Sequence, residues 1–326
     1  MKRTNIFIAI LLFFQFLAIG QQHETVGKSP WGPQDQIGTL NMMTEASKLE
    51  VLSKISSGKT YDLSVDYFVG MPSFHSLGDP GYQYWLTHTP HGTILDNPNG
   101  LGEKMNKKVS YTGDAISMYT HMGTHIDALN HFGLDGKIWN GYTPGEYLGD
   151  KGWKKTGAET IPPIIARGVL LDVADAKGSL PKNYRITSQD IQLTLEKQGM
   201  ELKPGDVVLI RTGQAEFYED APQYLDNYPG IGLDAVKWLV EEKGIMLLGA
   251  DNLSLEAFPP EREDNWVPVH TYLLAEKGLM FIEQLYLEKL SKDAVYEFAF
   301  IAASLKLRGA SASPMRPIAI PMNRKE

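Results

Sequence analysis

Three histidines and one aspartate stand close together in the first half of the chain, at His121, His125, Asp127 and His131. Neutral imidazoles and a carboxylate are the ligands that divalent transition metals select. The first three residues, with one position left open for water, would make a catalytic rather than a structural metal site. His131 would then serve as a general base, as a fourth ligand or as a partner of another ligand. The segment predicts a metal-dependent enzyme.

The spacing of the four residues indicates how the chain must run. Steps of 4, 2 and 4 positions place them on one face of an extended strand, whereas a helix would turn Asp127 away from His121 and His125. A straight strand would hold the first two histidines roughly 13 Å apart, too far for two bonds of about 2 Å to one metal. We therefore expect the chain to fold back at Gly123, with Thr124 bracing the turn. The alternative is a chance grouping of histidines, in a chain that has eight among 326 residues.

Residues 1–20 are typical of a secretory signal peptide. Two basic residues precede a mostly apolar stretch over residues 6–17, and Ala18 and Gly20 supply the small side chains of a cleavage site. The stretch is short for a membrane span, and an uncleaved N-terminal anchor is the alternative. No cysteine follows, which excludes a lipid-modified N-terminus. We expect a protein exported to the periplasm or secreted, with a mature chain of residues 21–326 and no stable membrane insertion after cleavage.

The composition excludes several classes of protein. The formal net charge is −8 and no basic run is present, so nucleic acid is not an expected partner. The chain has no cysteine, so a metal would have to be held by His, Asp and Glu side chains. Gly230 and Gly232 match a loose dinucleotide fingerprint, but a polar, proline-containing segment precedes them instead of a strand. A small-molecule substrate is the expected partner.

Apolar patterns along the chain predict interleaved strands and helices. Strands are expected over residues 60–69, 168–173, 206–211, 245–250 and 297–305, and helices over residues 187–198 and 234–243. The elements do not alternate strictly, which favours a mixed-sheet α/β domain over a Rossmann or barrel fold. No linker is evident, so residues 21–326 are expected to form one domain. Arg211 lies in an apolar strand and is expected to need a carboxylate partner.

Residues 71–102 are expected to form a long loop without regular structure, because they are rich in Gly, Pro, Asn and aromatic residues. Aromatic side chains of this loop could cover a cleft, and Trp85 is the candidate for a substrate contact. The alternative is a surface excursion or a contact between subunits.

The pattern His-x-Gly-Thr-His-x-Asp-x-x-x-His-Phe over residues 121–132 resembles the signature of the cyclase family, which includes bacterial kynurenine formamidase and isatin hydrolase. Further segments resemble the same family, at residues 31–41, 204–213, 249–254 and 309–317. Together they span most of the chain, and the resemblance implies a swivelling β/β/α architecture and a homo-oligomer. One departure is Leu129, where the family often has proline; it removes no ligand and leaves the substrate open.

The resemblance also implies site residues in the second half of the chain. By position, His270 and Glu283 would complete the set of metal ligands, with Asp127 as the bridge where a second metal is bound. Glu276 and Gln284 show how a small change of register would move the acidic ligand. Zinc or manganese is the expected metal, as one or two ions.

The implied reaction is the hydrolysis of a C–N bond in a small amide or lactam, as in an arylformamidase. A metal lowers the pKa of bound water from about 15.7 toward about 7 and polarises a carbonyl group. The resemblance favours His131 as the base that takes the proton of water and passes it to the leaving nitrogen. Two alternatives are a metal-assisted lyase or cyclase acting on a small carbonyl compound and a non-catalytic metal- or ligand-binding protein of the cell envelope.

Overall fold

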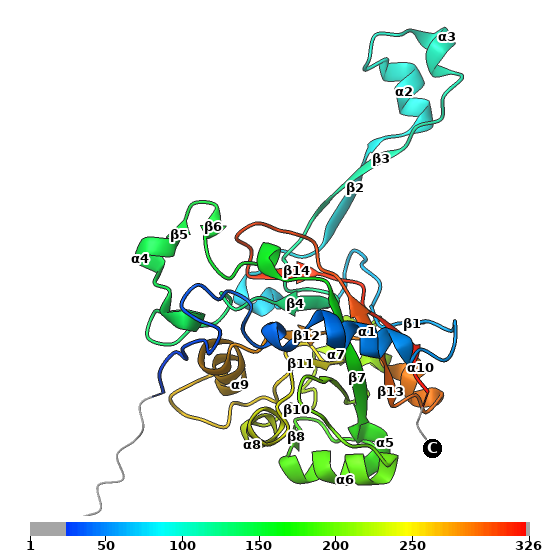
Figure 1. Ribbon diagram of the computed structural model, residues 1–326. Coiled ribbons are helices and arrows are strands. Elements are labelled where there is room, and N and C mark those ends of the chain that lie inside the picture. The colour runs from blue at the N-terminus through cyan, green and yellow to red at the C-terminus, as the bar shows by residue number, and fades with distance from the viewer. Residues whose placement is uncertain (1–23, 324–326) are drawn as a thin grey trace, which may run out of the picture.

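The centre of the protein is a curled mixed sheet of nine strands, in the order β1-β15-β13-β7-β9-β11-β12-β4-β14 (Figure 1). The computed structural model describes residues 24–323, so the predicted signal peptide lies outside the described residues. The strands of the sheet are β1 (Tyr61–Asp62), β4 (His125–Asp127), β7 (Ile164–Asp172), β9 (Val207–Arg211), β11 (Leu247–Ala250), β12 (Phe281–Glu283), β13 (Glu297–Ala302), β14 (Ala312–Pro314) and β15 (Ile318–Pro321).

The middle of the sheet is parallel and its flanks are antiparallel. β7, β9, β11 and β12 run parallel to one another, whereas β13, β15 and β1 on one side and β4 and β14 on the other pair antiparallel. All residues of β11 and all but the last of β9 are buried, which explains their continuous apolar sequence. The mixed α/β sheet that the sequence predicts is confirmed.

Helices and short turns surround this sheet, with α6 and α8 at the lower end in Figure 1. The α-helices are α1 (Glu45–Ser53), α2 (Pro90–Asp96), α3 (Glu103–Asn106), α4 (Pro144–Tyr147), α5 (Val173–Lys177), α6 (Ser188–Gln198), α7 (Ala221–Tyr224), α8 (Leu233–Lys237), α9 (Pro268–His270) and α10 (Glu288–Lys292). π-helical turns, η6 (Trp238–Glu242) and η7 (Thr271–Lys277), continue α8 and α9. Short 3-10 turns lie at Gly38–Met42, His75–Leu77, Trp139–Gly141, Ala158–Thr160 and Gln214–Phe217.

Both predicted helices are confirmed. α6 begins at a reciprocal cap, in which the Thr187 side chain accepts from the backbone of Asp190 and the Asp190 side chain accepts from the backbone of Thr187. It ends at Gly199, which adopts φ +61°. α8 and η6 together cover the second predicted helix. No helix among the described residues is long and apolar enough to cross a membrane.

Two sequence predictions are wrong in detail. Of the strand expected over residues 60–69, only Tyr61–Asp62 pairs in the sheet. The next residues stay extended but bond to loops instead: the backbone N–H of Leu63 donates to the Pro317 carbonyl, and that of Val65 to the Thr124 hydroxyl. A strand pattern in the sequence does not distinguish these two kinds of partner.

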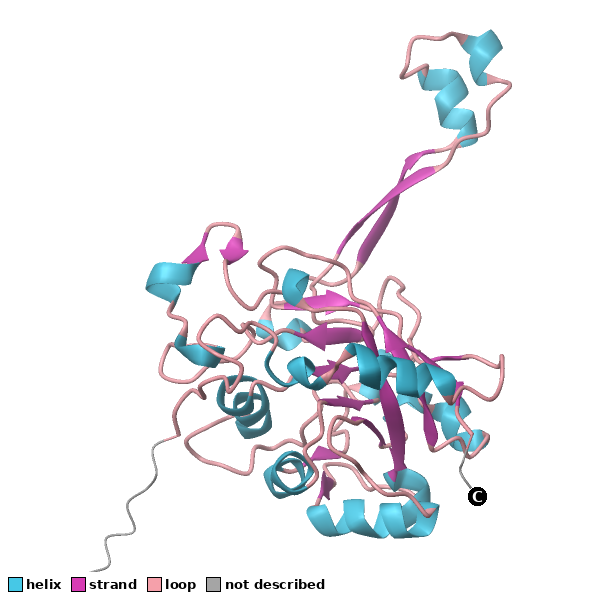
Figure 2. Ribbon diagram, viewed as in Figure 1, coloured by secondary structure: helices cyan, strands magenta, loops and turns pink. Residues whose placement is uncertain are grey.

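The loop expected over residues 71–102 is largely an ordered arm. β2 (Gln83–His88) pairs with β3 (Gly113–Ser117) as an antiparallel hairpin, and α2 and α3 lie at its tip. Figures 1 and 2 show this hairpin extending away from the body of the molecule. Two further pairs of short strands lie outside the large sheet: β5 (Leu148–Gly149) with β6 (Gly152–Trp153), and β8 (Arg185–Ile186) with β10 (Gly230–Ile231).

Candidate metal centre

Strand β4 carries two of the predicted ligands on one face. His125 and Asp127 alternate with Ile126, and all three residues are fully buried. β4 lies between β12 and β14, and its antiparallel register with β12 sets Glu283 directly opposite His125. His125 Nε2 lies 3.3 Å from Asp127 Oδ1 and 3.3 Å from Glu283 Oε2. Strand pairing therefore brings the predicted acidic ligand of the second half to the central cluster.

The chain folds back before β4, as the spacing predicts. Gly123 adopts φ +62°, and a Cβ atom there would lie 2.4 Å from the ring of Tyr67. Both the backbone angle and the lack of space require glycine at this position. The turn brings His121 to the same carboxylate, with 2.8 Å between His121 Nδ1 and Asp127 Oδ1.

Thr124 braces the turn through contacts with other segments. Its hydroxyl donates to the Gln284 carbonyl over 2.6 Å and accepts from the backbone N–H of Val65 over 3.0 Å. Gln284 adopts φ +56°, and its side-chain oxygen accepts from the backbone N–H of Gly123 over 3.2 Å. The side chain of Gln284 is thus used to hold the turn, and Glu283 is the residue of this strand that reaches His125.

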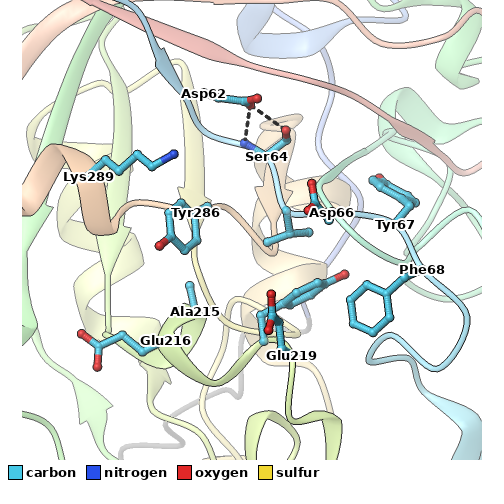
Figure 3. A pocket seen from close by; sticks show the side chains of 12 residues that line it. Asp62, Ser64, Asp66, Tyr67, Phe68, Ala215, Glu216, Glu219, Tyr286 and Lys289 are labelled. Carbon is cyan, nitrogen blue, oxygen red and sulfur yellow. Dashed lines mark hydrogen bonds between the residues drawn. The ribbon is translucent and has the colours of Figure 1, made fainter.

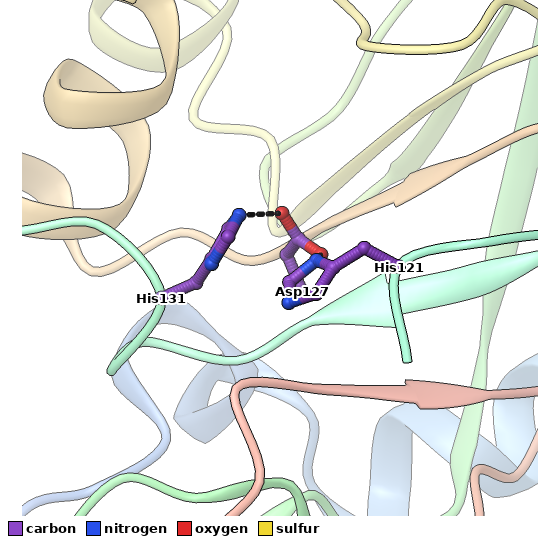
Figure 4. Close-up of side chains that lie close together, drawn as sticks. All are labelled: His121, Asp127 and His131. Carbon is purple, nitrogen blue, oxygen red and sulfur yellow. Dashed lines mark ion pairs between the residues drawn. The ribbon is translucent and has the colours of Figure 1, made fainter. Parts of the chain in front are cut away.

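His131 approaches the cluster through the other oxygen of Asp127 (Figure 4). Its Nε2 lies 3.5 Å from Asp127 Oδ2, whereas His121 and His125 approach the other oxygen of Asp127, Oδ1. Two trios of potential ligands result, His121–Asp127–His131 and His125–Asp127–Glu283, with the ligand atoms of each trio within 4.8 Å of one another. Asp127 belongs to both trios, so the arrangement suits one ion or a bridged pair.

The atoms at the centre of the cluster lack hydrogen-bonding partners. Among the described residues, none makes a hydrogen bond with His121 Nδ1, His125 Nε2, either side-chain oxygen of Asp127, or Glu283 Oε1, although all five atoms are buried. Buried polar atoms without partners cost free energy. A divalent cation would satisfy imidazole nitrogens and carboxylate oxygens together. The donor set therefore fits a metal ion.

The opposite nitrogen of each of these two histidines has a neighbour that orients the ring. The Nδ1–H of His125 donates to the Gly123 carbonyl over 2.7 Å, so Nε2 is the nitrogen that faces the cluster. His121 Nε2 lies 2.8 Å from the Ser311 hydroxyl, so its Nδ1 faces Asp127. Such outer contacts are typical of histidines that ligate metals.

His270 lies on the other side of Glu283. Its Nε2 is 3.5 Å from Glu283 Oε1, and its Nδ1–H donates to Glu256 Oε1 over 2.5 Å. The backbone N–H of His270 donates to the same oxygen of Glu256 over 3.1 Å. Glu256 was missed by the sequence analysis. It follows Ser254 in an irregular segment after β11, and no local pattern links it to a histidine fourteen positions later.

The carboxylates dominate the electrostatics of two of these histidines. Burial favours the neutral imidazole, but the close carboxylates of Asp127 and Glu283, each 3.3 Å from Nε2, outweigh it and raise the pKa of His125 to about 10. Burial is likewise outweighed at His270, where Glu256 and Glu283 raise the pKa to about 10. A metal ion must therefore displace protons from the cluster when it binds.

The pKa of His131 is shifted in the opposite direction. Burial, and then the charge of His121, holds the pKa of His131 well below its ordinary value. Its imidazole therefore favours the neutral form, from which a general base must start, and the Asp127 carboxylate acts in the opposite sense by stabilising the protonated ring.

His131 is also the most accessible member of the cluster. Its side chain is 18% exposed, whereas the side chains of the other candidate ligands are at most 6% exposed. Aromatic rings surround it: Phe132 lies 4.3 Å from the His131 ring and 5.6 Å from Trp266, between ring centroids. On the other side, the Tyr119 ring lies 5.0 Å from that of His121. His131 is therefore the member of the cluster that solvent reaches best, and aromatic rings lie close to it and to His121.

The predicted substrate contact, Trp85, does not lie on the strands that carry the cluster. It is on β2 of the projecting hairpin, opposite Ala115, and is 47% exposed. The hairpin that carries it projects away from the sheet that contains β4 (Figure 1). Its role in substrate binding stays a prediction.

A separate cleft of about 970 Å³ lies beside Tyr67 (Figure 3), whose ring is close to Gly123 in the turn that precedes β4. Its walls include Asp66, Tyr67, Glu219 and Tyr286, and none of the candidate ligands lines it. The Tyr67 hydroxyl donates to the Thr124 carbonyl over 2.6 Å, so one wall of the cleft contacts the turn that precedes β4.

Arg211 has the carboxylate partners expected of a buried arginine. Its guanidinium lies 2.9 Å from Asp172 and 2.5 Å from Glu288. Asp251 is equally structural, because it accepts hydrogen bonds from the backbone and hydroxyl of Thr212 and from the backbone of Gly213. These residues stabilise the strand ends next to the site.

Comparison with solved structures places this fold among known proteins. A crystal structure described as a novel cyclase has a TM-score of 0.80 and 31% identity, covering 91% of this chain and 100% of its own. Isatin hydrolase A from Ralstonia solanacearum has a TM-score of 0.62 and 22% identity, covering 81% of this chain and 92% of its own. The second likeness shows the fold alone, and both identify the fold as the cyclase type.

Curated proteins of similar sequence agree. Cyclase-like protein 3 of Oryza sativa subsp. japonica is 26% identical over 264 residues, which are 81% of this chain and 80% of that protein. Kynurenine formamidase of Bacillus anthracis is 27% identical over 207 residues, which are 64% of this chain and 79% of that protein. The model of the family described as Putative cyclase matches residues 61–257. With its fold and its buried His/Asp/Glu cluster, the chain belongs to the cyclase family.

Proposed function

We propose that the protein is a metal-dependent hydrolase that cleaves a C–N bond in a small amide or lactam. One observation carries the proposal: a partly exposed His131, whose burial favours the neutral ring, stands beside a buried cluster in which five polar atoms make no hydrogen bond with the described residues. The cluster is suited to hold a cation, and the histidine is suited to move a proton at its mouth. A binding protein would need the first feature but not the second.

Each side chain then has a distinct task. His121, His125, Asp127 and Glu283 would hold the ion, and His270 would complete the set beside Glu283. When bound, zinc or manganese supplies a Lewis acid that polarises a carbonyl oxygen and acidifies water. His131 would accept a proton on Nε2, where the Asp127 carboxylate 3.5 Å away stabilises the protonated ring against the cost of burial.

The proton held by His131 can then be returned to the leaving nitrogen. Amide cleavage requires this transfer, because an amide anion is a poor leaving group. The partial exposure of His131 places it where substrate and cluster meet, so one side chain can perform both transfers.

The rings around the mouth favour a flat, apolar substrate. Tyr119, Phe132 and Trp266 flank His121 and His131, and Trp266 is 58% exposed. Aromatic rings pack well against other rings in edge-to-face or offset arrangements. The names of the relatives agree with this choice, since one is a kynurenine formamidase and another an isatin hydrolase. Aryl formamides and aryl-fused lactams are therefore the substrates to test first.

The test combines metal analysis with a substrate panel. Purified protein would be analysed for bound metal, stripped with chelator, and reloaded separately with zinc and manganese. Each form would be assayed on formanilide, N-formylkynurenine, isatin and simple lactams in ¹⁸O-labelled water. Metal-dependent release of a carboxylate that carries ¹⁸O supports hydrolysis. Turnover without label would indicate a lyase or cyclase, and tight metal binding without turnover of any amide or lactam would contradict the proposal.

A further inference from the structure

The cleft beside Tyr67 has the size and the walls of a small-molecule site. Its volume of about 970 Å³ lies at the upper end of the range for such sites, roughly 300–1,000 Å³. The rings of Tyr67, Phe68 and Tyr286 line it, together with four carboxylates and one lysine. The candidate metal ligands, all of which lie in the described chain, are not part of its walls. The metal centre therefore does not account for this cleft.

Two of the four carboxylates are not engaged in an ion pair. Asp62 and Glu216 each pair with an arginine, over 2.6 and 3.2 Å. Asp66 and Glu219 make no hydrogen bond and no ion pair with any residue of the described chain. The charge of Arg316 acts on Asp66 only at longer range, because the hydrogen bonds of its guanidinium go to Asp62. The cleft thus presents negative charge that the fold itself does not use.

A third unused group in the walls is the hydroxyl of Tyr218. The residue is only 5% exposed, and its hydroxyl makes no hydrogen bond with the described residues. The ring packs edge-on against those of Phe68 and Tyr224, with 6.0 and 5.3 Å between ring centroids. Burial, and then the charges of Tyr67 and Asp66, raise the pKa of Tyr218, so the hydroxyl keeps its proton at ordinary pH. A buried hydroxyl without a partner costs free energy, which a bound ligand would recover.

The carboxylates of the cleft are placed for a ligand larger than a metal ion. Among the described residues, the groups that bring three ligand atoms within 4.8 Å of one another are those of the metal centre. Figure 3 shows Asp66 and Phe68 on the side of the cleft opposite Lys289. Lys289 Nζ lies 5.7 Å from the centroid of the Tyr286 ring, so the lysine has an aromatic partner at its own end. The acidic end, which also carries an aromatic ring, is the end suited to a cation.

We propose that the cleft binds a small organic molecule that carries a primary ammonium group on an apolar body. A primary ammonium has three N–H donors, and the cleft offers three acceptor groups without a partner in the described chain, at Asp66, Glu219 and the Tyr218 hydroxyl. The rings of Tyr67 and Phe68 line the same cleft. Aromatic rings stabilise a nearby cation and pack against an apolar body. Because the cleft is separate from the metal centre, this ligand binds in addition to the substrate.

Titration calorimetry of the purified protein with three probes that share one ring tests which group is recognised. The probes are benzylammonium, benzyl alcohol and benzyltrimethylammonium. We expect benzylammonium to bind about tenfold more tightly than the neutral alcohol, which lacks the charge that carboxylates and rings attract. It should also bind more tightly than the trimethylated cation, which has no N–H to donate. Equal affinity for benzylammonium and the alcohol, or tighter binding of the trimethylated cation, would overturn the proposal.

Tyr218→Phe removes the hydroxyl and keeps the ring. We expect it to weaken the binding of benzylammonium about tenfold, since a hydrogen bond to a charged group is lost. Its melting temperature should equal or exceed that of the wild type, because in the free protein the hydroxyl has no partner among the described residues. An unchanged affinity would contradict the proposal, and a lower melting temperature would show that the hydroxyl serves the fold instead of a ligand.

The double variant Asp66→Asn/Glu219→Gln removes the two free charges and should weaken the binding of benzylammonium about tenfold. Asp150→Asn/Glu263→Gln makes the same change of charge at exposed positions outside the cleft and should bind as the wild type does. The affinity should also be the same before and after treatment with chelator, because the candidate metal ligands do not line the cleft. An equal loss in both double variants would assign binding to the overall charge, and a loss on treatment with chelator would assign it to the metal centre. Either result would overturn the proposal.

Discussion

At the scale of single residues, the two nitrogens of each histidine decide what the ring can do. In the rings of His121, His125 and His270, one nitrogen contacts a group outside the cluster. The other nitrogen of each ring faces the carboxylate of Asp127 or Glu283. For His270 the outer partner is the carboxylate of Glu256, which fixes the ring and increases its basicity as a ligand. Glu256 is therefore a positioning residue for metal binding.

Replacing Glu256 by Gln is expected to lower metal affinity about 10- to 100-fold, because outer partners of ligand histidines have effects of that size. Competition with a chromophoric chelator measures the affinity directly. Glu263→Gln, the same change at an exposed position, is the control and should leave affinity unchanged. Equal affinities in the two variants would show that Glu256 only stabilises the fold.

His131→Ala is expected to lower turnover about 10²- to 10⁴-fold, the usual contribution of a general base, while metal content stays at the wild-type level. The reason is that His131 is the neutral and most accessible member of the cluster. Metal analysis of the purified variant accompanies the assay. His75→Ala, at an exposed histidine, is the control. Loss of metal from the His131 variant would place this residue in the coordination shell instead.

At the scale of elements, the central cluster was predictable because one short segment holds it. Even spacing along a strand and a glycine at the turn are local features, and β4 and Gly123 confirm both. The positions of Glu283 and Glu256 relative to the cluster depend on the pairing of β12 with β4 and on an irregular segment after β11. Such long-range pairing leaves no periodic trace in the sequence, so only the resemblance to a family pointed to Glu283.

The stabilising contacts of the N-terminal segment could not be predicted from the sequence either. The sequence of residues 31–41 shows only a resemblance to the family, whereas in the structure Asp35 in this segment is the acceptor of several hydrogen bonds. It accepts hydrogen bonds from the Ser29 hydroxyl, the Asn41 amide, the Trp139 indole and two backbone N–H groups. These contacts fasten the segment to the 3-10 turn that contains Trp139.

Asp35→Asn is expected to destabilise the protein by about 1–3 kcal/mol at neutral pH, since hydrogen bonds to a charged group are lost. Burial opposes ionisation, but the hydrogen bonds from Ser29, Ile37, Asn41 and Trp139 lower the pKa of Asp35 below 3.8. A lowered folded-state pKa stabilises the protein above pH 3.8, and this contribution is lost as the pH falls below that value.

Urea denaturation of the wild type and the Asp35 variant, at neutral pH and at the lowest pH where both still fold, measures this difference. The difference in free energy of unfolding should shrink toward acid pH. Asp150→Asn, at an exposed aspartate, should match the wild type at both. A difference that is constant with pH would mean that the charge of Asp35 is not the stabilising feature.

At the scale of the whole molecule, the cluster lies where several parts of the fold meet. His125 and Asp127 come from β4, Glu283 from β12, and His270 from α9, which leads into η7. In the absence of a cation, unpartnered carboxylate oxygens are held in the interior of the sheet, which opposes folding. A bound ion would turn the same atoms into a link between the sheet and the α9–η7 segment.

Removal of metal should therefore lower the stability of the fold and not only the activity of the protein. At a free metal concentration about 100-fold above the dissociation constant, binding adds about 2.7 kcal/mol to the free energy of unfolding. Thermal denaturation with and without chelator should show this as a lower melting temperature in chelator, restored by added zinc or manganese. Asp127→Ala should melt at the same temperature in both conditions, because the residue common to both trios is gone. A wild type whose melting temperature is unaffected by chelator, in protein shown to have lost its metal, would mean that the cluster does not join these elements through an ion.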